Sequence, residues 1–422
     1  MPSLPPSLSV LREREYRLLF GAQLVSLLGD QMVSVALAFA VIGIGGSASD
    51  VGLVFAVRSA ALVAGLPAGG VVADRVARRT VLIAADLARL LSQGVLAAVL
   101  ILGTTSVAAV AALSALTAVA SGFFNPASTG FLVSVVSPAG VQQANVLRSV
   151  SASGGRIAGP VLAAALVATA GAGWALAVDA ATFAVSAALV SRMGAGAAPV
   201  VRDRAASFLM DLREGWDAFR SRTWLWAFVA FFAFLNLTYG ALQVIGPLIV
   251  ERDLGGATAW GAIVGASGVG GVIGGVMALR IAPRRPLLVA ALACGLVLVT
   301  GALLAAGAPV VVVALGAVVS ELGLMLSITL WESTLQRHVE PAVLSRASAY
   351  DWLGTMALAP VGLAVWGPIA AGLGYADALW LAFGLSLAGV VAIVSVRAVR
   401  TLPPAPTSRP AGGTSRRRAR RR

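Results

Sequence analysis

Residues 69–79 read Gly-Gly-Val-Val-Ala-Asp-Arg-Val-Ala-Arg-Arg and stand between two long apolar runs, the second of which begins at Thr80. One acid and three arginines are costly to place in hydrocarbon, so a cluster of this kind marks chain that faces water. The stretch is also too short for anything but a tight connection. We therefore predict that residues 69–79 form a turn between two membrane-spanning helices.

A weaker copy of this stretch occurs about half the chain length later. Residues 274–285 read Gly-Gly-Val-Met-Ala-Leu-Arg-Ile-Ala-Pro-Arg-Arg, and with one inserted proline they align with residues 69–79, Leu279 standing where Asp74 stood. A repeat at this spacing is expected of a duplicated six-helix unit. Arginines also collect in any inward-facing turn, so the second copy alone is equally well explained by membrane topology.

The composition is that of a polytopic membrane protein. Of the 422 residues 59% are hydrophobic and only 12% are charged, with a mean hydropathy of +0.91, whereas soluble domains are about 25% charged. All 31 basic residues are arginine, and the net charge is +13. Because most of them lie in loops between apolar runs and in the C-terminal tail, we interpret these arginines as topology signals and contacts to anionic lipid head groups. A nucleic-acid partner is not expected.

Several chemistries are excluded by what the sequence lacks. The single cysteine, Cys294, falls in the middle of an apolar run, and the single histidine, His338, falls in a predicted loop. An internal disulfide, a histidine metal site and a catalytic triad therefore cannot form, and no metal, cofactor or enzymatic activity is expected. A chain without lysine has no nucleotide-binding loop of the Gly-x-x-x-x-Gly-Lys type. Residues 1–10 carry no signal-peptide pattern.

Twelve runs are long enough to span a membrane, at about 20 residues per span. We predict spans at 16–42, 51–73, 80–102, 106–130, 146–170, 173–192, 224–248, 257–281, 286–306, 309–332, 346–370 and 376–397. If the N-terminus is cytoplasmic, the loops predicted on the outer side contain a single arginine, Arg252. The positive-inside rule then favours cytoplasmic N- and C-termini in the cell membrane.

This pattern predicts an all-α protein of two pseudo-symmetric six-helix bundles. We place the first bundle at 1–192, a cytoplasmic linker at 193–223, the second bundle at 224–400 and a disordered, arginine-rich cytoplasmic tail at 401–422. Within the linker, Phe208, Leu212, Trp216 and Phe219 recur at helical spacing, which is typical of an amphipathic helix on the inner membrane surface.

Charged residues inside a span are functional candidates because their desolvation is costly. Asp30 lies near the middle of the first span, and Arg58 lies at a similar depth in the second. An ion pair between them is geometrically reasonable. Two interpretations remain open: Asp30 couples proton uptake to conformation, or the two residues form a permanent structural pair that never titrates.

Further polar residues mark the other spans. Glu321 lies near the middle of 309–332, and Arg156 lies in 146–170. Both are cavity candidates, as are Asn125 and Asn236.

A second set of charges has a simpler explanation. Asp86 and Arg89 stand three residues apart and can pair on one helix face, which we interpret as structural. Asp179 lies nearer the outer end of its span.

The turn at 69–79 predicts a latch at the inner membrane surface. Asp74 can pair with Arg78, and its neighbour Arg75 can contact Asp351, which lies at the inner end of the eleventh span. Such contacts stabilise one of two conformations and must break in the other. The candidate gate residues are Gly70, Asp74, Arg75, Arg78, Arg79 and Asp351.

Residues 69–79 resemble the signature loop between helices 2 and 3 of the major facilitator superfamily, with Val72 and Ala77 in place of the usual leucine and glycine. Gly155, Gly159 and Pro160 are similar to the Gly-x-x-x-Gly-Pro motif in helix 5 of its proton-driven exporters. Small residues there let neighbouring helices approach, and the proline removes one backbone hydrogen bond.

Segments 17–31, 177–183 and 348–354 resemble the bacterial branch that contains macrolide-efflux and enterobactin-export proteins. The resemblance implies a monomer that exchanges protons for a hydrophobic or amphipathic small molecule, such as a drug, antibiotic or siderophore, by alternating access. An importer or a lipid-type flippase of the same fold, and a membrane sensor without transport activity, are the alternatives.

The latch makes a specific prediction. Reversing the charge of Arg75 or of Asp351 alone should reduce transport, and swapping the two charges should restore it, because the ion pair is re-formed with the opposite polarity. Transport assays on the two single variants and the double variant measure this. A double variant no more active than the singles would show that the residues do not meet.

Overall fold

The computed structural model describes residues 10–137, 140–194, 216–217 and 219–403. Over these ranges the regular structure is helical, with no β-strand. Twelve helices are long and apolar enough to cross a membrane. The prediction of an all-α protein with twelve spans is confirmed.

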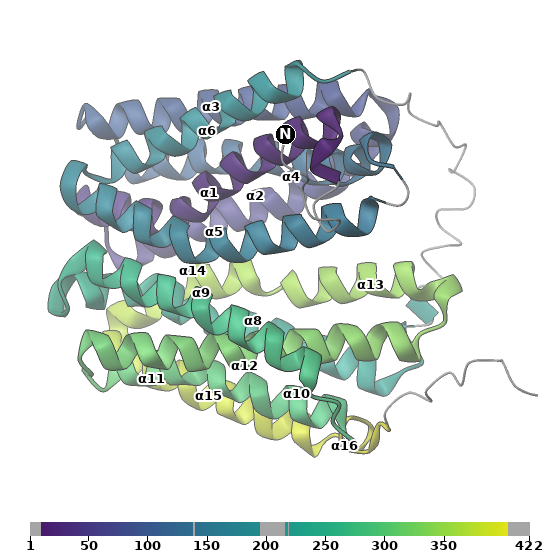
Figure 1. Cartoon of the computed structure of the whole chain (residues 1–422). Helices are drawn as coiled ribbons and strands as arrows, with labels where there is room; N and C mark the ends of the chain where they lie inside the picture. Colours follow the sequence, from purple (N-terminus) through teal and green to yellow (C-terminus); the bar gives the residue numbers. More distant parts are fainter. Residues whose placement is uncertain (1–9, 138–139, 195–215, 218, 404–422) are drawn as a thin grey trace, which may run out of the picture.

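The spans form two groups that follow one another along the chain (Figure 1). The first group, called the N-half here, consists of α1 (Arg14–Gly43), α2 (Ala48–Arg75), α3 (Arg78–Ile101), α4 (Val107–Val135), α5 (Val141–Ala170) and α6 (Ala172–Ser191). The second, the C-half, consists of α8 (Thr223–Asp253), α9 (Gly256–Arg280), α10 (Pro286–Cys294), α11 (Leu298–Ala305), α12 (Val310–His338), α13 (Pro341–Met356), α14 (Ala359–Leu373), α15 (Tyr375–Ser395) and α16 (Arg397–Thr401).

Different turns join the helices at the two ends of the molecule. At the end where α6 stops and α8 starts, called the linker end here, α2 and α3 are joined by the turn predicted from residues 69–79. At the opposite or far end, α1 and α2 are joined by a turn in which Gly45 has a φ of 81°. There the Ser47 side chain caps α2 together with Asp50, so the first turn of the helix has its backbone donors satisfied.

The apolar core shows how the halves meet. One cluster of buried side chains contains residues of both halves, among them Val41 and Val54 of the N-half and Val244 and Trp366 of the C-half, and it lies toward the far end. Two further clusters lie toward the linker end, and each is confined to one half. The halves are therefore packed together at the far end and separate at the linker end.

Glycine permits the closest contacts across this interface. A Cβ on Gly52 of α2 would collide with the carbonyl oxygen of Leu363 on α14. On the other side of the interface, a Cβ on Gly268 of α9 would lie 2.9 Å from the carbonyl oxygen of Arg156 on α5. Without side chains at these points the backbones of the two halves come into direct contact, as in other membrane helix pairs.

Two predicted single spans are broken in the structure, and both belong to the C-half. The span predicted at 286–306 divides into α10 and α11 around a 3₁₀ turn at Gly295–Val297. The span predicted at 346–370 divides into α13 and α14 at residues 357–358, just before Pro360, which has no N–H to continue the helix. The glycine and the proline account for breaks that hydropathy alone does not show.

Other expectations are corrected or lie outside the described residues. His338 ends α12 instead of lying in a loop, and its Nδ1 is 3.0 Å from the Thr334 carbonyl oxygen, because the helix continues beyond the apolar run. Residues 195–215, which hold most of the predicted linker helix, and the tail beyond residue 403 lie outside the described residues. Trp216 and Phe219 stack on each other, and both rings contact the ring of Tyr350 on α13 in a tilted arrangement.

The far-end contact at Gly52 predicts a conformational effect. Gly52→Val should open the far end, because the new side chain collides with the backbone of α14, and overpacking of this kind costs about 1–3 kcal/mol. A cysteine at Ser34, which lines the cavity between the halves, reports this opening through its reaction with a membrane-impermeant maleimide applied to the far face. We expect labelling about tenfold faster than in the parent.

The background and control for this experiment are present in the chain. The native Cys294 is fully buried, so it should contribute little labelling. Gly372→Val makes the same substitution at a glycine of α14 whose Cβ would meet open space, and it should leave the rate unchanged. Equal rates in the Gly52 and Gly372 variants would contradict the proposed role of this contact.

Candidate functional site

The N-half contains a cluster of five charged residues from four helices. Its members, called the charge cluster here, are Asp30 of α1, Arg58 of α2, Asp86 and Arg89 of α3, and Asp179 of α6. Arg89 lies at its centre with a side chain that is only 1% exposed. The guanidinium forms an ion pair with Asp86 one turn earlier, and its Nη1 lies 3.7 Å from Oδ2 of Asp30.

Two aromatic rings complete the surroundings of Arg89. Its Cζ lies 4.0 Å from the ring centroid of Phe124 on α4 and 4.3 Å from that of Phe183 on α6. A guanidinium over ring faces gains a cation–π interaction that is strengthened when water is excluded. The position of Arg89 is therefore determined by three helices besides its own.

The two fully buried carboxylates of the cluster have neutral hydrogen-bond donors. The Ser186 hydroxyl lies 2.7 Å from Oδ2 of Asp86, to which it can donate, and Nε2 of Gln93 donates to Oδ2 of Asp179 at 2.9 Å. These contacts join α3 to α6. They reduce the cost of burying Asp86 and Asp179, since buried charges are tolerated only when paired and hydrogen-bonded.

The ion pair that depth along the membrane suggested, between Asp30 and Arg58, is not formed within 4 Å among the described residues, and Arg89 pairs with Asp30 instead. The residues sit at similar depths, but depth does not determine which helices are neighbours. Arg58 interacts electrostatically with both Asp30 and Asp179. Its Nη1 is buried without a hydrogen-bond partner in the described structure, as are Nε of Arg89 and Oδ1 of Asp179.

The cluster is one positive charge short of neutrality. Three carboxylates and two guanidiniums give a formal charge of −1 when all are ionised, and one bound proton removes it. Asp30 is the accessible acid, with a side chain 38% exposed, whereas the side chain of Asp86 is 0% exposed. Of the three carboxylates in the cluster, Asp30 is therefore the one that a proton from solvent reaches most directly.

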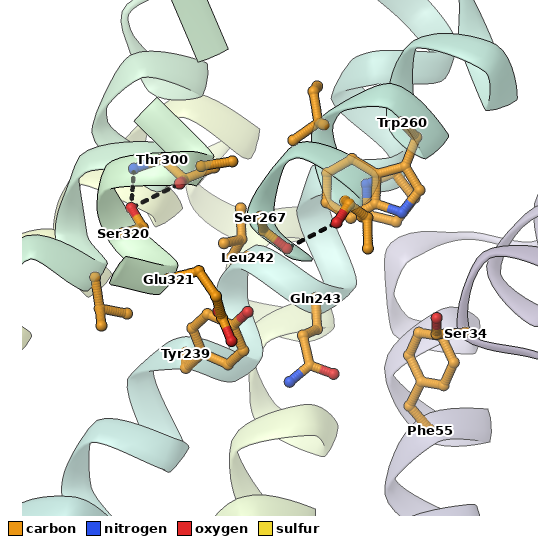
Figure 2. Close-up of a pocket in the computed structure, with 15 residues that line it drawn as sticks. Ser34, Phe55, Tyr239, Leu242, Gln243, Trp260, Ser267, Thr300, Ser320 and Glu321 are labelled. Carbon is orange, nitrogen blue, oxygen red and sulfur yellow. Dashed lines mark hydrogen bonds between the residues drawn. The ribbon is translucent and has the colours of Figure 1, made fainter. Parts of the chain in front are cut away.

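A cavity of about 250 Å³ lies in the C-half and opens toward the N-half (Figure 2). Its walls come mainly from α8, α9 and α12, with contributions from α1 and α2. The lining residues that matter most below are Phe55, Tyr239, Gln243, Trp260, Ser267 and Glu321. Among the lining residues of the described structure, Glu321 alone carries a charge.

Glu321 is placed by the packing of α12 on α9. A Cβ on Gly271 of α9 would lie 3.3 Å from Cγ of Glu321, so the glycine makes room for this side chain. Figure 2 shows its carboxyl group beside the ring of Tyr239. Within the described chain it has no hydrogen bond and no ion pair within 4 Å; Arg156 of the N-half acts on it electrostatically.

The helix-5 residues lie between the two candidate sites. Gly155 and Gly159 face α1, where a Cβ on Gly159 would lie 3.0 Å from the backbone of Gln31, next to Asp30 in the chain. The buried Pro160 lies inside α5, which continues as a helix through it. Arg156 is exposed, and its carbonyl faces α9. This motif therefore connects the first helix of the N-half to the C-half.

The remaining predicted polar residues lie elsewhere. Asn125 is exposed on α4, and neither it nor Asn236 lines the cavity described above. Nδ2 of Asn236 donates to the Thr355 carbonyl oxygen at 3.2 Å, just before the break between α13 and α14. This amide satisfies a carbonyl that a broken helix would otherwise leave without a partner.

The predicted latch residues are not paired with one another. Arg78 Nη1 donates to the Gly130 carbonyl oxygen at 2.7 Å, and Arg79 donates to carbonyl oxygens at the end of α6. Asp74 and Arg75 are exposed, as expected of a turn, and Gly70 is half-buried in α2. In the described structure no ion pair joins Asp74 to Arg78.

Arg75 and Asp351 likewise form no ion pair in the described residues. Both oxygens of Asp351 accept from Nε1 of Trp331 at 3.2 Å. The halves are separate at this end, so a contact between Arg75 and Asp351 stays a prediction for a conformation in which the linker end is closed.

Sequence reasoning missed several residues of these sites. Tyr239, Gln243 and Trp260 line the cavity, and Gln93 and Ser186 support the charge cluster. A polar residue within an apolar run was the available signal for Gln93, Ser186 and Gln243. No signal was present for the two aromatic residues, because most large side chains in such helices face lipid or a neighbouring helix.

The arrangement of helices is shared with solved transporters. The structure is similar to a nucleoside transporter, NupG (TM-score 0.72, 15% identity), over 89% of this chain and 98% of that one. It is also similar to a bacterial homolog of the human lysosomal transporter Spinster in an inward-facing conformation (0.70, 13%; 93% and 96% covered). A third similar structure is a POT family transporter in complex with a peptide conjugate (0.68, 14%; 90% and 95%).

The sequence comparisons agree with this likeness of fold. No curated protein sequence matches the chain. A family model, described as the Major Facilitator Superfamily, matches residues 19–355, which is most of the chain and includes the turn at 69–79 and both candidate sites. The chain is therefore a membrane transporter that belongs to the Major Facilitator Superfamily.

Proposed function

We propose that this protein is a proton-coupled exporter of hydrophobic or amphipathic small molecules that works by alternating access. The observation that supports this most directly is the charge cluster of the N-half. Asp30 is half-buried and lies 3.7 Å from the guanidinium of a fully buried arginine. A protein that only needed a stable helix bundle would gain nothing from bearing the desolvation cost of these charges.

The cluster offers a reason for coupling. With all five groups ionised it holds one uncompensated negative charge, which is tolerated best when Asp30 is in contact with water. Passage between the two open conformations removes that water, so an ionised Asp30 opposes the change, and a proton taken up from the far end lowers its cost on the return to the linker-open conformation. Proton binding and the position of the two halves then depend on each other, as thermodynamic linkage requires.

The cavity of the C-half supplies the second requirement, a site reached from one side at a time. Its walls come from α8, α9 and α12 of the C-half together with Ser34 and Phe55 of the N-half, and in this structure the linker end is the separated one. Substrate that binds here and is released after the far end opens has crossed the membrane. In exchange, a proton that entered at the far end is released at the linker end.

The charge pattern supports an orientation of the protein in its membrane. We infer that the linker end is cytoplasmic, that both termini are cytoplasmic and that the protein lies in the cell membrane, since arginines are concentrated on that side. We further propose that it acts as a monomer whose inner surface contacts anionic lipid head groups. Import, or movement of a lipid, would use the same fold with the opposite direction or a different cargo.

The decisive experiment measures transport in proteoliposomes with an imposed pH gradient. A panel of hydrophobic and amphipathic compounds is tested with the purified protein, and the best substrate is then used for variants. Asp30→Asn should abolish the gradient dependence and lower gradient-driven transport at least about tenfold, because the accessible proton site is lost. Asp377→Asn, at an exposed carboxylate of the far end, is the matched control and should transport like the parent.

Each outcome separates the competing functions. Accumulation in the direction opposite to that proposed would identify an importer, and movement of labelled phospholipid alone would identify a flippase. Transport that ignores a collapsed proton gradient, or an Asp30→Asn variant with unchanged gradient dependence, would contradict proton coupling.

Arg89 should be essential for stability as well as for transport. Arg89→Gln leaves Asp86 buried without its ion-pair partner, which typically costs about 3–5 kcal/mol. Thermal unfolding in detergent should therefore show a marked loss of stability. Asp86→Asn combined with Arg89→Gln should be more stable than Arg89→Gln alone, because the uncompensated charge is gone.

A double-mutant cycle quantifies this coupling. Arg337→Gln, at the linker end of α12 and outside the cluster, serves as the control for loss of one arginine. Strictly additive effects of the Asp86 and Arg89 substitutions would show that the pair is not energetically coupled.

A further inference from the structure

The cavity of the C-half contains one acidic group and no base among its lining residues in the described structure. Glu321 projects into it from α12 at mid-membrane depth, with no hydrogen bond or ion pair within 4 Å in the same ranges. Its aliphatic stem packs on Gly271, so the carboxyl group cannot withdraw easily to the other side of α12. The site therefore presents to whatever occupies the cavity a carboxylate that has no direct ion-pair or hydrogen-bond partner in the described residues, although Arg156 acts on it electrostatically from outside the cavity.

The rest of the wall is suited to a large apolar body. Phe55, Tyr239 and Trp260 contribute aromatic surface, and a few hydroxyl and amide groups, among them those of Gln243 and Ser267, supply polar contacts (Figure 2). Aromatic rings attract cations through their faces as well as apolar groups through their area. A volume of about 250 Å³ holds one or two aromatic rings, with the remainder of a ligand extending between the halves.

From these features we infer that the cavity selects hydrophobic organic cations, and that Glu321 is the residue that recognises their charge. This deepens the proposed function and rests on it for the direction of transport. A neutral or anionic ligand would bury Glu321 without a counter-charge, which is costly in a low-dielectric site. A cation supplies that counter-charge, and the aromatic wall binds the apolar groups around it.

Recognition of the cation and uptake of the proton then take place in different halves. The cation meets Glu321 in the C-half, whereas the charge cluster with Asp30 lies in the N-half. Cargo and proton therefore use different carboxylates and are related through the closure of the halves. Arg156 acts on Glu321 electrostatically from the N-half without lining the cavity.

The experiment compares two probes of the same shape and opposite charge. Tetraphenylphosphonium and tetraphenylborate are measured by equilibrium binding to the purified full chain in nanodiscs of neutral lipid, with empty nanodiscs subtracted. The parent should bind the phosphonium saturably and more tightly than the borate. Glu321→Gln should weaken phosphonium binding about 10- to 100-fold, which corresponds to loss of one contact to a charged group.

Two further variants make the result specific. Glu321→Asp keeps the charge and should retain most of the preference for the cation. Glu332→Gln removes an exposed carboxylate from the same helix, outside the cavity, and should bind like the parent. Thermal unfolding of each variant identifies loss of fold, which would otherwise imitate loss of binding.

Three outcomes overturn the inference: no saturable phosphonium binding, equal binding of both probes, or unchanged phosphonium affinity in Glu321→Gln. If the affinity is unchanged and Glu321→Gln loses as much stability as Arg156→Gln, Glu321 is only the structural partner of Arg156. Because binding is measured without a gradient, charge selection can fail while proton-driven transport is retained, and the reverse.

Discussion

The burial of Arg89 is the constraint on which the N-half depends. A guanidinium that is 1% exposed at this depth needs an opposite charge, and Asp86 and Asp30 provide it from α3 and α1. It also needs surfaces that exclude water without repelling a cation, which Phe124 and Phe183 provide. Four helices are thereby held to one another by a single side chain, so α1, α3, α4 and α6 have little freedom to slide independently.

The C-half is organised on a different principle. It keeps one acid at the cavity wall, and the buried polar residues of its described core are serines and threonines. Phe228, Phe232 and Trp331 pack ring against ring at the linker end. The halves share apolar packing only toward the far end. The two halves thus meet across an apolar contact whose closest approaches are at glycines, and they can separate without breaking any ion pair in the described structure.

Much of the fold could be predicted from the sequence, because hydrocarbon imposes a minimum helix length and arginines mark the turns. The twelve spans and the turn at 69–79 follow from these two facts. The candidate sites could be predicted only in part: the sequence singles out Asp30, Arg58, Asp86, Arg89 and Asp179 as charges inside spans, but it does not show that they converge. Depth along a helix is encoded in the sequence, whereas the partner that a side chain faces depends on the packing of helices distant in sequence.

The same limit explains the individual errors. His338 was assigned to a loop because polar residues at a helix end look like loop residues. Arg58 was paired with Asp30 because both stand at one depth, although the nearer guanidinium comes from α3. The aromatic residues of the cavity could not be separated from the many that face lipid, since both kinds are equally compatible with an apolar helix.

The two interrupted helices give the molecule an uneven stiffness. Every span of the N-half is continuous in the described structure, while the C-half has a 3₁₀ turn between α10 and α11 and a break between α13 and α14. A break whose carbonyl is held by Asn236 can bend without exposing bare backbone to lipid. The segment α13 can therefore change its angle to α14 at this break. Such local bending can narrow the passage toward the linker end before the two halves move as rigid bodies.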